Sequence, residues 1–155
     1  MGTGSDVGDQ APDFALPSTV GEIKLSQLLA KGPVLLVFYP GDDTPVCTKQ
    51  LCNYRDNLDV FGELGVQVVA VNPQSVASHQ AFASKHKLPF PVAADTTKAV
   101  CRAYAALNFL GMAKRALVLI GRDGRVRWRR TDFPIFHQTA ADIRQAVAGL
   151  GSDLG

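Results

Sequence analysis

One stretch decides how this chain folds, namely Val34-Leu35-Leu36-Val37-Phe38-Tyr39-Pro40-Gly41-Asp42-Asp43-Thr44-Pro45-Val46-Cys47. Its first five residues are all apolar, which is typical of a buried strand. Pro40 interrupts the strand, because proline has no N–H to donate to a sheet. Thr44 is then a predicted helix N-cap and Pro45 the first helical residue, where an N–H has no helical partner in any case. A buried strand therefore leads directly into a helix that carries Cys47 in its first turn.

Cys47 is placed where a thiol becomes reactive. The first turn of a helix presents free backbone N–H groups and the positive end of the helix dipole, and both favour an anion. The thiolate is the reactive form of cysteine, so this position favours a nucleophile. Cys52 follows five residues later and supplies a second thiol. The alternative is that Cys47 is only a small buried apolar residue, but the cap, the proline and the second cysteine together favour reactivity.

Strands and helices alternate along the chain. The predicted elements are a hairpin at 14–25, a helical turn at 26–29, strands at 33–38 and 67–71, helices at 45–61 and 75–85, an extended segment at 89–93, a helix at 97–104, a strand at 116–120, a strand at 125–130 and a helix at 140–148. This order predicts an α/β fold with a mixed central sheet, helices on both faces and an N-terminal β-hairpin. The pattern fits a thioredoxin-like fold, although periodicity alone does not separate it from other small three-layer sandwiches.

Length and composition predict a single globular domain. The 155 residues are 46% apolar and 19% charged, and the net charge of +2 indicates no class of partner. We predict one domain over residues 1–155 with a mobile tail at 149–155. The apolar runs are too short for a membrane span, and residues 1–6 lack the pattern of a secretory signal. Three cysteines, an odd number, favour a reducing compartment, here the cytoplasm, over a disulfide scaffold.

The residues around Cys47 resemble a known family. Pro40, Thr44 and Cys47 match the active-site signature Pro-x-x-x-Thr-x-x-Cys of the peroxiredoxins. Residues 43–52, followed by Arg55-Asp56, are similar to the bacterioferritin comigratory protein and peroxiredoxin Q branch, which often carries a second cysteine five positions after the first. Further matches in the order of that branch are residues 8–14, 85–91, 94–95, 114–120 and 123–126.

The resemblance implies a thioredoxin-like fold and a thiol-dependent peroxidase that reduces hydrogen peroxide and organic hydroperoxides. Cys47 would be the peroxidatic cysteine, oxidised to a sulfenic acid, and Cys52 the resolving cysteine, whose disulfide thioredoxin reduces. Arg115, otherwise an ordinary solvent-facing residue at a strand end, would bring a guanidinium to the sulfur as in the family. Thr44 lies one helical turn before Cys47 and can point its hydroxyl at the sulfur, while Pro40 can exclude water. The branch also suggests a monomer without cofactor or metal.

The motif departs from the branch at two positions. Val46 stands where glycine is usual, which predicts a tighter backbone and narrower access beside the cysteine. Gly41 stands where lysine is common, which removes a positive charge near the mouth of the site. Asp42 and Asp43 are interpreted as turn residues that face water, since nearby carboxylates disfavour a thiolate.

Other candidate residues carry weaker signals. Cys101, in a predicted short helix, is interpreted as a packed apolar residue, with the resolving cysteine as its second possibility. His79 and His86 are about 10 Å apart along a predicted helix, too far for one metal ion, and His137 is alone in a loop. The apolar residues 133–136 have three interpretations: a wall of the active site, a contact patch or part of the core.

A run of arginines near the end of the chain raises the question of nucleic acid. Alternation along a strand predicts that one face carries Arg125, Arg127 and Arg129, and the other carries Val126 and Trp128. A solvated hairpin face explains this pattern better than nucleic-acid binding does.

Two other functions stay open. A thiol–disulfide oxidoreductase would favour cysteines separated by two residues at a helix start, whereas Cys47 and Cys52 have four residues between them. A non-enzymatic redox sensor or chaperone would use the Cys47–Cys52 disulfide to switch a surface. Repeated turnover with hydrogen peroxide and a reducing system separates a peroxidase from both.

Overall fold

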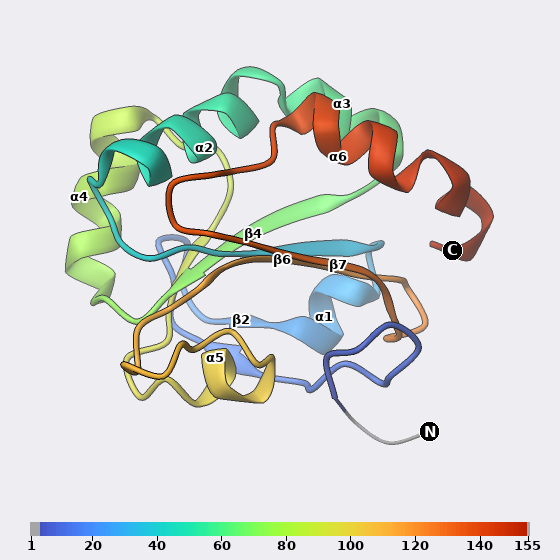
Figure 1. The fold of residues 1–155 in the computed structure, drawn as a ribbon, viewed down its shortest axis with the longest axis horizontal. Helices are drawn as coiled ribbons and strands as arrows, with labels where there is room; N and C mark the ends of the chain where they lie inside the picture. Colours follow the sequence, from blue (N-terminus) through green and yellow to red (C-terminus); the bar gives the residue numbers. More distant parts are fainter. Residues whose placement is uncertain (1–3, 155) are drawn as a thin grey trace.

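A five-stranded mixed sheet lies at the centre of the protein, whose computed structural model describes residues 4–154 (Figure 1). The strands are β3 (Val34–Phe38), β4 (Gln67–Asn72), β5 (Val92–Ala94), β6 (Arg115–Ile120) and β7 (Val126–Asp132), in the order β5-β4-β3-β6-β7. A separate hairpin consists of β1 (Ala15–Leu16) and β2 (Ile23–Lys24). The helices are α1 (Leu25–Leu29), α2 (Pro45–Asp56), α3 (Leu58–Leu64), α4 (Val76–His86), α5 (Ala99–Ala103) and α6 (Ala140–Val147).

The central strand β3 brings distant parts of the chain together. It pairs in parallel with β4 and antiparallel with β6, and all five of its residues are buried. In the antiparallel register Phe38 lies opposite Ala116, so Arg115, the first residue of β6, starts beside Tyr39. The helix α2 follows from this same end of β3. The sheet therefore places the start of β6 next to the start of α2.

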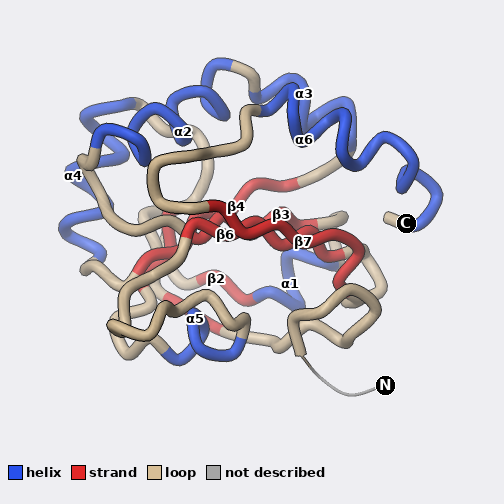
Figure 2. Tube along the Cα trace, in the orientation of Figure 1, coloured by secondary structure: helices blue, strands red, loops and turns tan. Residues whose placement is uncertain are grey.

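Helices cover both faces of the sheet, as predicted (Figure 2). Alternate residues of β3 and β6, such as Leu35 and Leu117, pack against α2, α3 and α6; we call this the α2-side core. The other residues, such as Leu36 and Val118, pack against the hairpin, α1 and α5; we call this the α5-side core. This two-sided burial explains why the central strands are continuous apolar runs.

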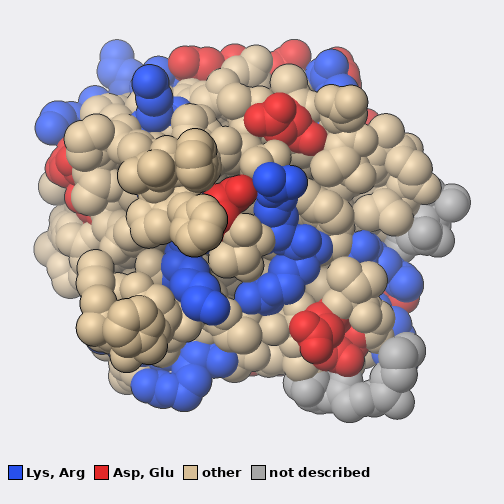
Figure 3. Space-filling view, in the orientation of Figure 1, with Lys and Arg blue, Asp and Glu red and all other residues tan. Residues whose placement is uncertain are grey.

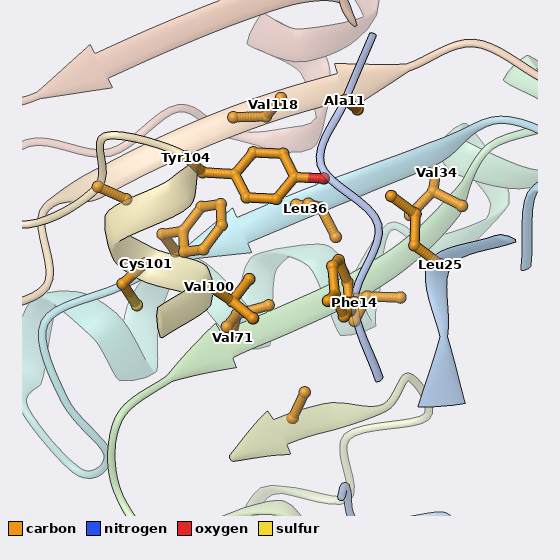
Figure 4. Close-up of a cluster of buried hydrophobic side chains, with 14 of the residues drawn as sticks. Ala11, Phe14, Leu25, Val34, Leu36, Val71, Val100, Cys101, Tyr104 and Val118 are labelled. Carbon is orange, nitrogen blue, oxygen red and sulfur yellow. The ribbon is translucent and has the colours of Figure 1, made fainter. Parts of the chain in front are cut away.

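Cys101 lies in the α5-side core, among Phe14, Val100 and Tyr104 (Figure 4). It is fully buried, and its backbone N–H donates to the carboxylate of Asp95 at 2.7 Å. Burial raises the pKa of the Cys101 thiol, and the neighbouring Asp95 raises it further. The sheet separates this core from the face that carries α2, so Cys101 has the burial expected of a packed apolar residue.

The predicted helix from 45 to about 61 is wrong in its length. The structure divides it into α2 and α3 at Asn57, whose side-chain amide donates to the carbonyl of Asn53 at 2.9 Å. Asparagine competes in this way for the backbone bonds of a helix, which favours a break. The second helix then runs through Gly62, where there is open space for a side chain, and ends at Gly65 with φ of 69°.

The predicted alternation along β7 is also wrong. A register shift between Leu119 and Ile120 pairs them with Trp128 and Val126, so Arg127 is an extra residue on its strand. Such a bulge changes which face each following side chain takes. Val126 consequently lies in the α5-side core, whereas Trp128 packs against the α2-side core.

The end of the chain lies against the fold. The 3-10 helix η1 (Ala148–Asp153) follows α6, and the carbonyl of Leu154 accepts a hydrogen bond from the N–H of Arg122 at 3.0 Å. Leu154 is also buried. The mobile tail over residues 149–155 stays a prediction, and Gly155 lies outside the described residues. Among those described, no helix has the length and apolar character needed to cross a membrane.

Cys101 is expected to resist alkylation in the folded protein. Its thiol is buried and its raised pKa keeps it protonated, whereas Cys52 is partly exposed. Peptide mass spectrometry after iodoacetamide treatment should therefore find Cys52 modified and Cys101 free, and unfolding in denaturant should make both react. Labelling of the two residues at equal rates in the native protein would contradict this placement.

Candidate active site

Cys47 occupies the first turn of α2, two residues after its first residue, Pro45, and is completely buried in the α2-side core. Thr44 has the extended backbone of an N-cap residue, as predicted, and its carbonyl accepts from the N–H of Thr48 at 2.9 Å. Cys52 lies further along the same helix and is partly exposed. Both thiols are free.

The guanidinium of Arg115 contacts the sulfur. Arg115 Nη2 lies 3.2 Å from Cys47 Sγ, and the arginine is only 2% exposed. Arg115 lies two residues before Leu117 in β6, and residues two apart in a strand share one face of the sheet. The side chain of Arg115 therefore points to the face that is covered by α2. The structure thus brings together two of the residues singled out in the sequence, although 68 positions separate them.

Gln50 and Pro134 supply the other acceptors of Arg115. The side-chain carbonyl of Gln50 accepts a hydrogen bond from Arg115 Nη1 at 2.6 Å. The backbone carbonyl of Pro134 accepts one from Arg115 Nη2 at 2.8 Å. Gln50 Nε2 in turn donates to the hydroxyl of Tyr54 at 3.0 Å, which donates to the carbonyl of Gln138 at 2.7 Å. A chain of hydrogen bonds therefore runs from the sulfur to the loop before α6.

Gln50 and Tyr54 were missed in the sequence. The available signal was their spacing, because positions three and seven residues after Cys47 share its helical face. An apolar face that contains a glutamine one turn beyond the reactive cysteine indicates a buried polar contact, but only the position of Arg115 identifies the partner.

Thr44 and Pro40 lie beside Cys47 in the loop between β3 and α2. The hydroxyl of Thr44 donates to the carbonyl of Gly41 at 3.2 Å, and Thr44 is exposed. Pro40 is half-buried at the end of β3. The roles predicted for Thr44 and Pro40 at the sulfur stay predictions.

The interpretation of Asp42 as a water-facing turn residue is wrong. Its side chain is only 4% exposed and lies 2.7 Å from Nδ1 of His79, which is fully buried in α4. Burial alone would raise the pKa of Asp42, but hydrogen bonds from His79, Tyr39 and Ser78 outweigh it and lower the pKa. Asp43 does face water, and its carboxylate lies 3.2 Å from Lys85 Nζ.

The remaining candidates lie apart from the sulfur. His79 binds Asp42 and His86 approaches Asp43, and among the described residues no group of histidine, cysteine and carboxylate side chains could hold a metal ion. His137 lies near Arg115 and Lys49, and burial together with these two charges lowers its pKa.

The loop at 133–136 is not part of the core. Phe133 is 77% exposed and Ile135 is 71% exposed. Phe109, in the loop between α5 and β6, is 96% exposed. A pocket of about 450 Å³ lies between these loops, and its lining includes Phe109, Phe133, Pro134 and Arg115. In Figure 3, Lys and Arg side chains gather in the middle of the face shown, with Asp and Glu side chains close by.

The substitution Gln50→Leu is expected to lower the free energy of unfolding by about 1.5–3 kcal/mol, because it leaves a buried guanidinium without one acceptor. Urea denaturation under reducing conditions measures this change. Lys49→Ala, at the exposed neighbouring position, serves as the control and should change stability by about 0.5 kcal/mol or less. Equal stability of the two variants would show that the Arg115–Gln50 contact does not stabilise the fold.

Comparison with known proteins identifies the family. Residues 7–129 match the AhpC/TSA family. Peroxiredoxin Bcp of Bacillus subtilis is 34% identical over 136 residues, which cover 81% of this chain and 85% of that protein. The chloroplastic peroxiredoxin Q of Sedum lineare is 44% identical over 89 residues, 57% of this chain and 47% of that protein.

A solved structure extends the likeness to nearly the whole fold. Peroxidoxin BcpB from Mycobacterium tuberculosis has a TM-score of 0.81 and 31% identity, over 94% of this chain and 96% of that one. This likeness confirms the predicted thioredoxin-like fold. Because the family match, the relatives and the solved structure agree, the chain belongs to the AhpC/TSA family, in its Bcp and peroxiredoxin Q branch, and is a thiol-dependent peroxidase.

Proposed function

We propose that Cys47 attacks hydrogen peroxide or an organic hydroperoxide and that Cys52 resolves the product as an intramolecular disulfide. The observation that carries this proposal is the 3.2 Å contact between Arg115 Nη2 and Cys47 Sγ at the buried start of α2. A guanidinium and a helix N-terminus both favour an anionic sulfur, the form that attacks an oxygen atom. Cys52 is the partly exposed thiol on the same helix.

The proposed reaction has three steps. The Cys47 thiolate attacks one peroxide oxygen, the O–O bond breaks, and the leaving oxygen takes up a proton as water or an alcohol. Cys47 is left as a sulfenic acid, which condenses with the Cys52 thiol to form a disulfide and release water. A dithiol reductant, for which we propose thioredoxin, then exchanges with the disulfide and restores both thiols as its own pair is oxidised.

Arg115, Thr44 and Pro40 assist the first step in this proposal. Arg115 stabilises the sulfur before attack and the charge that develops on the leaving oxygen. The exposed Thr44 hydroxyl rotates from the carbonyl of Gly41 to the peroxide. Pro40, which has no N–H, excludes water from one side of the sulfur.

The pocket between the two exposed loops supports the inclusion of organic hydroperoxides among the proposed substrates. Its aromatic walls, Phe109 and Phe133, lie beside Arg115 and offer apolar contact for the organic part of a hydroperoxide. By likeness to the branch we also propose a monomer that works in the cytoplasm without cofactor, metal or nucleic acid.

Formation of the disulfide requires α2 to unwind. Residues five apart in a helix have Cα atoms roughly 8.6 Å apart, whereas a disulfide tolerates little beyond ~7 Å. Cys47 and Cys52 both lie inside α2, which is helical from Pro45 to Asp56. The first turns of α2 must therefore open before the two sulfur atoms can bond.

Substitution of each cysteine tests the proposed roles. Cys47→Ser is expected to abolish peroxide consumption, because it removes the attacking sulfur. Cys52→Ser should still consume about one equivalent and accumulate sulfenic acid, as no thiol remains to resolve it. Mass spectrometry and repeated turnover with a thioredoxin system measure both results, and Cys101→Ser is the control. Normal cycling of Cys52→Ser would remove the resolving role from Cys52.

Hydrogen exchange tests the proposed unwinding. Amides from Val46 to about Asn57 are expected to exchange faster in the oxidised protein than in the reduced one, because the disulfide is incompatible with the intact helix. Peroxide-treated Cys52→Ser should keep the protection of the reduced protein. The same protection in the reduced and disulfide forms would mean that the helix does not open.

A further inference from the structure

A buried pair of ionisable residues joins the loop before Cys47 to α4 and takes no part in the proposed chemistry. Asp42 and His79 meet at 2.7 Å between Oδ2 and Nδ1, and their side chains are 4% and 0% exposed. Asp42 belongs to the loop that joins β3 to α2, whereas His79 belongs to α4. The pair therefore connects the segment in front of Cys47 to a helix at the edge of the fold.

The hydrogen-bond partners of the histidine ring favour a proton on each of its nitrogens. Nδ1 faces the carboxylate of Asp42, and Nε2 lies 3.2 Å from the backbone carbonyl of Asn72. Both partners are acceptors only, so the ring satisfies them only when both of its nitrogens carry a proton. The ring is then an imidazolium, whose positive charge cancels the negative charge of Asp42.

Two hydroxyl groups complete the surroundings of the carboxylate. The hydroxyl of Tyr39 donates to Oδ1 at 2.5 Å, and that of Ser78 donates to Oδ2 at 2.7 Å. Burial raises the pKa of Tyr39, and the charges of Asp42 and Cys47 raise it further, so the phenol keeps its proton and donates.

The backbone of the loop is held at the same place. The N–H of Asp42 donates to the side-chain carbonyl of Gln74 at 2.6 Å, and the carbonyl of Tyr39 accepts from Asn72 Nδ2 at 2.7 Å. Gly41 fits closely between these contacts, since an added Cβ would lie 3.2 Å from Gln74 Oε1. The absence of a side chain at Gly41 leaves room for this attachment.

We propose that Asp42 and His79 are positioning residues, which fix the loop that carries Pro40 and Thr44 in front of Cys47 and whose opposite charges cancel within that loop. This inference rests on the proposed role of Cys47 as the attacking thiolate. An unpaired carboxylate in this loop would disfavour a thiolate by charge repulsion. The imidazolium of His79 removes that repulsion while the loop keeps its anchor.

Three variants in a Cys52→Ser background separate charge compensation from a merely structural role. His79→Gln keeps a donor for Asp42 but leaves its charge unpaired, Asp42→Asn leaves the imidazolium unpaired, and the double variant removes both charges. The measurements are the pH at which half of the Cys47 thiol has ionised, from thiolate absorbance, and the rate of a single oxidation by hydrogen peroxide. Gln80→Ala, at an exposed position of α4, is the matched control.

The expected result is a pair of opposite shifts. The ionisation midpoint of Cys47 should rise in His79→Gln, fall in Asp42→Asn and return toward the parent protein in the double variant. Oxidation at neutral pH should slow roughly tenfold in His79→Gln, which corresponds to about 1.4 kcal/mol, and recover to within about threefold in the double variant. The control should match the parent protein.

Shifts of both single variants in the same direction, or no shift in His79→Gln, would overturn the inference in favour of a purely structural pair. If His79→Gln does not fold, His79→Asn takes its place: a rise of the midpoint supports the inference, and a fall or no change overturns it. A parent protein that consumes no peroxide would instead refute the proposed function, and this inference with it.

Discussion

The contact between the Arg115 guanidinium and the Cys47 sulfur joins two parts of the chain that are 68 residues apart, and the site is arranged around it. Cys47 reaches this place through the helix after β3, and Arg115 reaches it through the first residue of β6. The antiparallel register, in which Phe38 pairs with Ala116, makes the two starting points adjacent. A slip of one residue would turn Arg115 to the opposite face of the sheet, because side chains alternate along a strand.

Burial of the guanidinium imposes further requirements on the chain. An arginine that is only 2% exposed needs acceptors for its donors, since an unpaired buried charge strongly destabilises a fold. Gln50 and the carbonyl of Pro134 meet this need, and Tyr54 then satisfies the amide of Gln50. The polar residues in this face of α2, and the path of the loop over it, thus follow from the position of Arg115.

Local signals in the sequence predicted most of the fold and the centre of the site. The apolar run before Pro40, the N-cap position of Thr44 and the proline at 45 are short-range features, and the structure agrees with each of them, although the Thr44 side chain makes no capping bond. The break at Asn57 and the bulge in β7 depend on competition among backbone hydrogen bonds, which residue patterns describe poorly. The fold itself required the resemblance, because strand order does not follow from periodicity.

The errors at the site concern polar side chains whose partners are distant in sequence. Asp42 was interpreted as a water-facing turn residue because a nearby carboxylate disfavours a thiolate, yet its partner His79 lies 37 positions away. Gln50 was overlooked because its partner, Arg115, is also distant in the sequence. Whether such residues face water or the core depends on tertiary pairing, and a single sequence contains no record of that pairing.

The segment that contains Cys47 and Cys52 is attached to the rest of the fold on both sides. These attachments allow an ordered site to contain a helix that opens in the proposed reaction. Before α2, Asp42 is bound to His79, and within the later turns Asn53 accepts from the N–H of Ala140 at 2.8 Å. Between these attachments, the side chain of Thr44 makes no capping bond to the helix. If Cys47 and Cys52 form the proposed disulfide, the part that must unwind is therefore the short segment that contains both of them.

Gln50 lies in the same segment, and this links the helix to the state of the sulfur. In the proposed cycle, opening of the first turns of α2 would take Gln50 away from Arg115, so the guanidinium would lose an acceptor together with the thiolate. Reduction of the proposed disulfide would release Cys47 and let both partners return to Arg115 as the helix closes. The contact that prepares the sulfur for attack would then be restored only with the reduced helix.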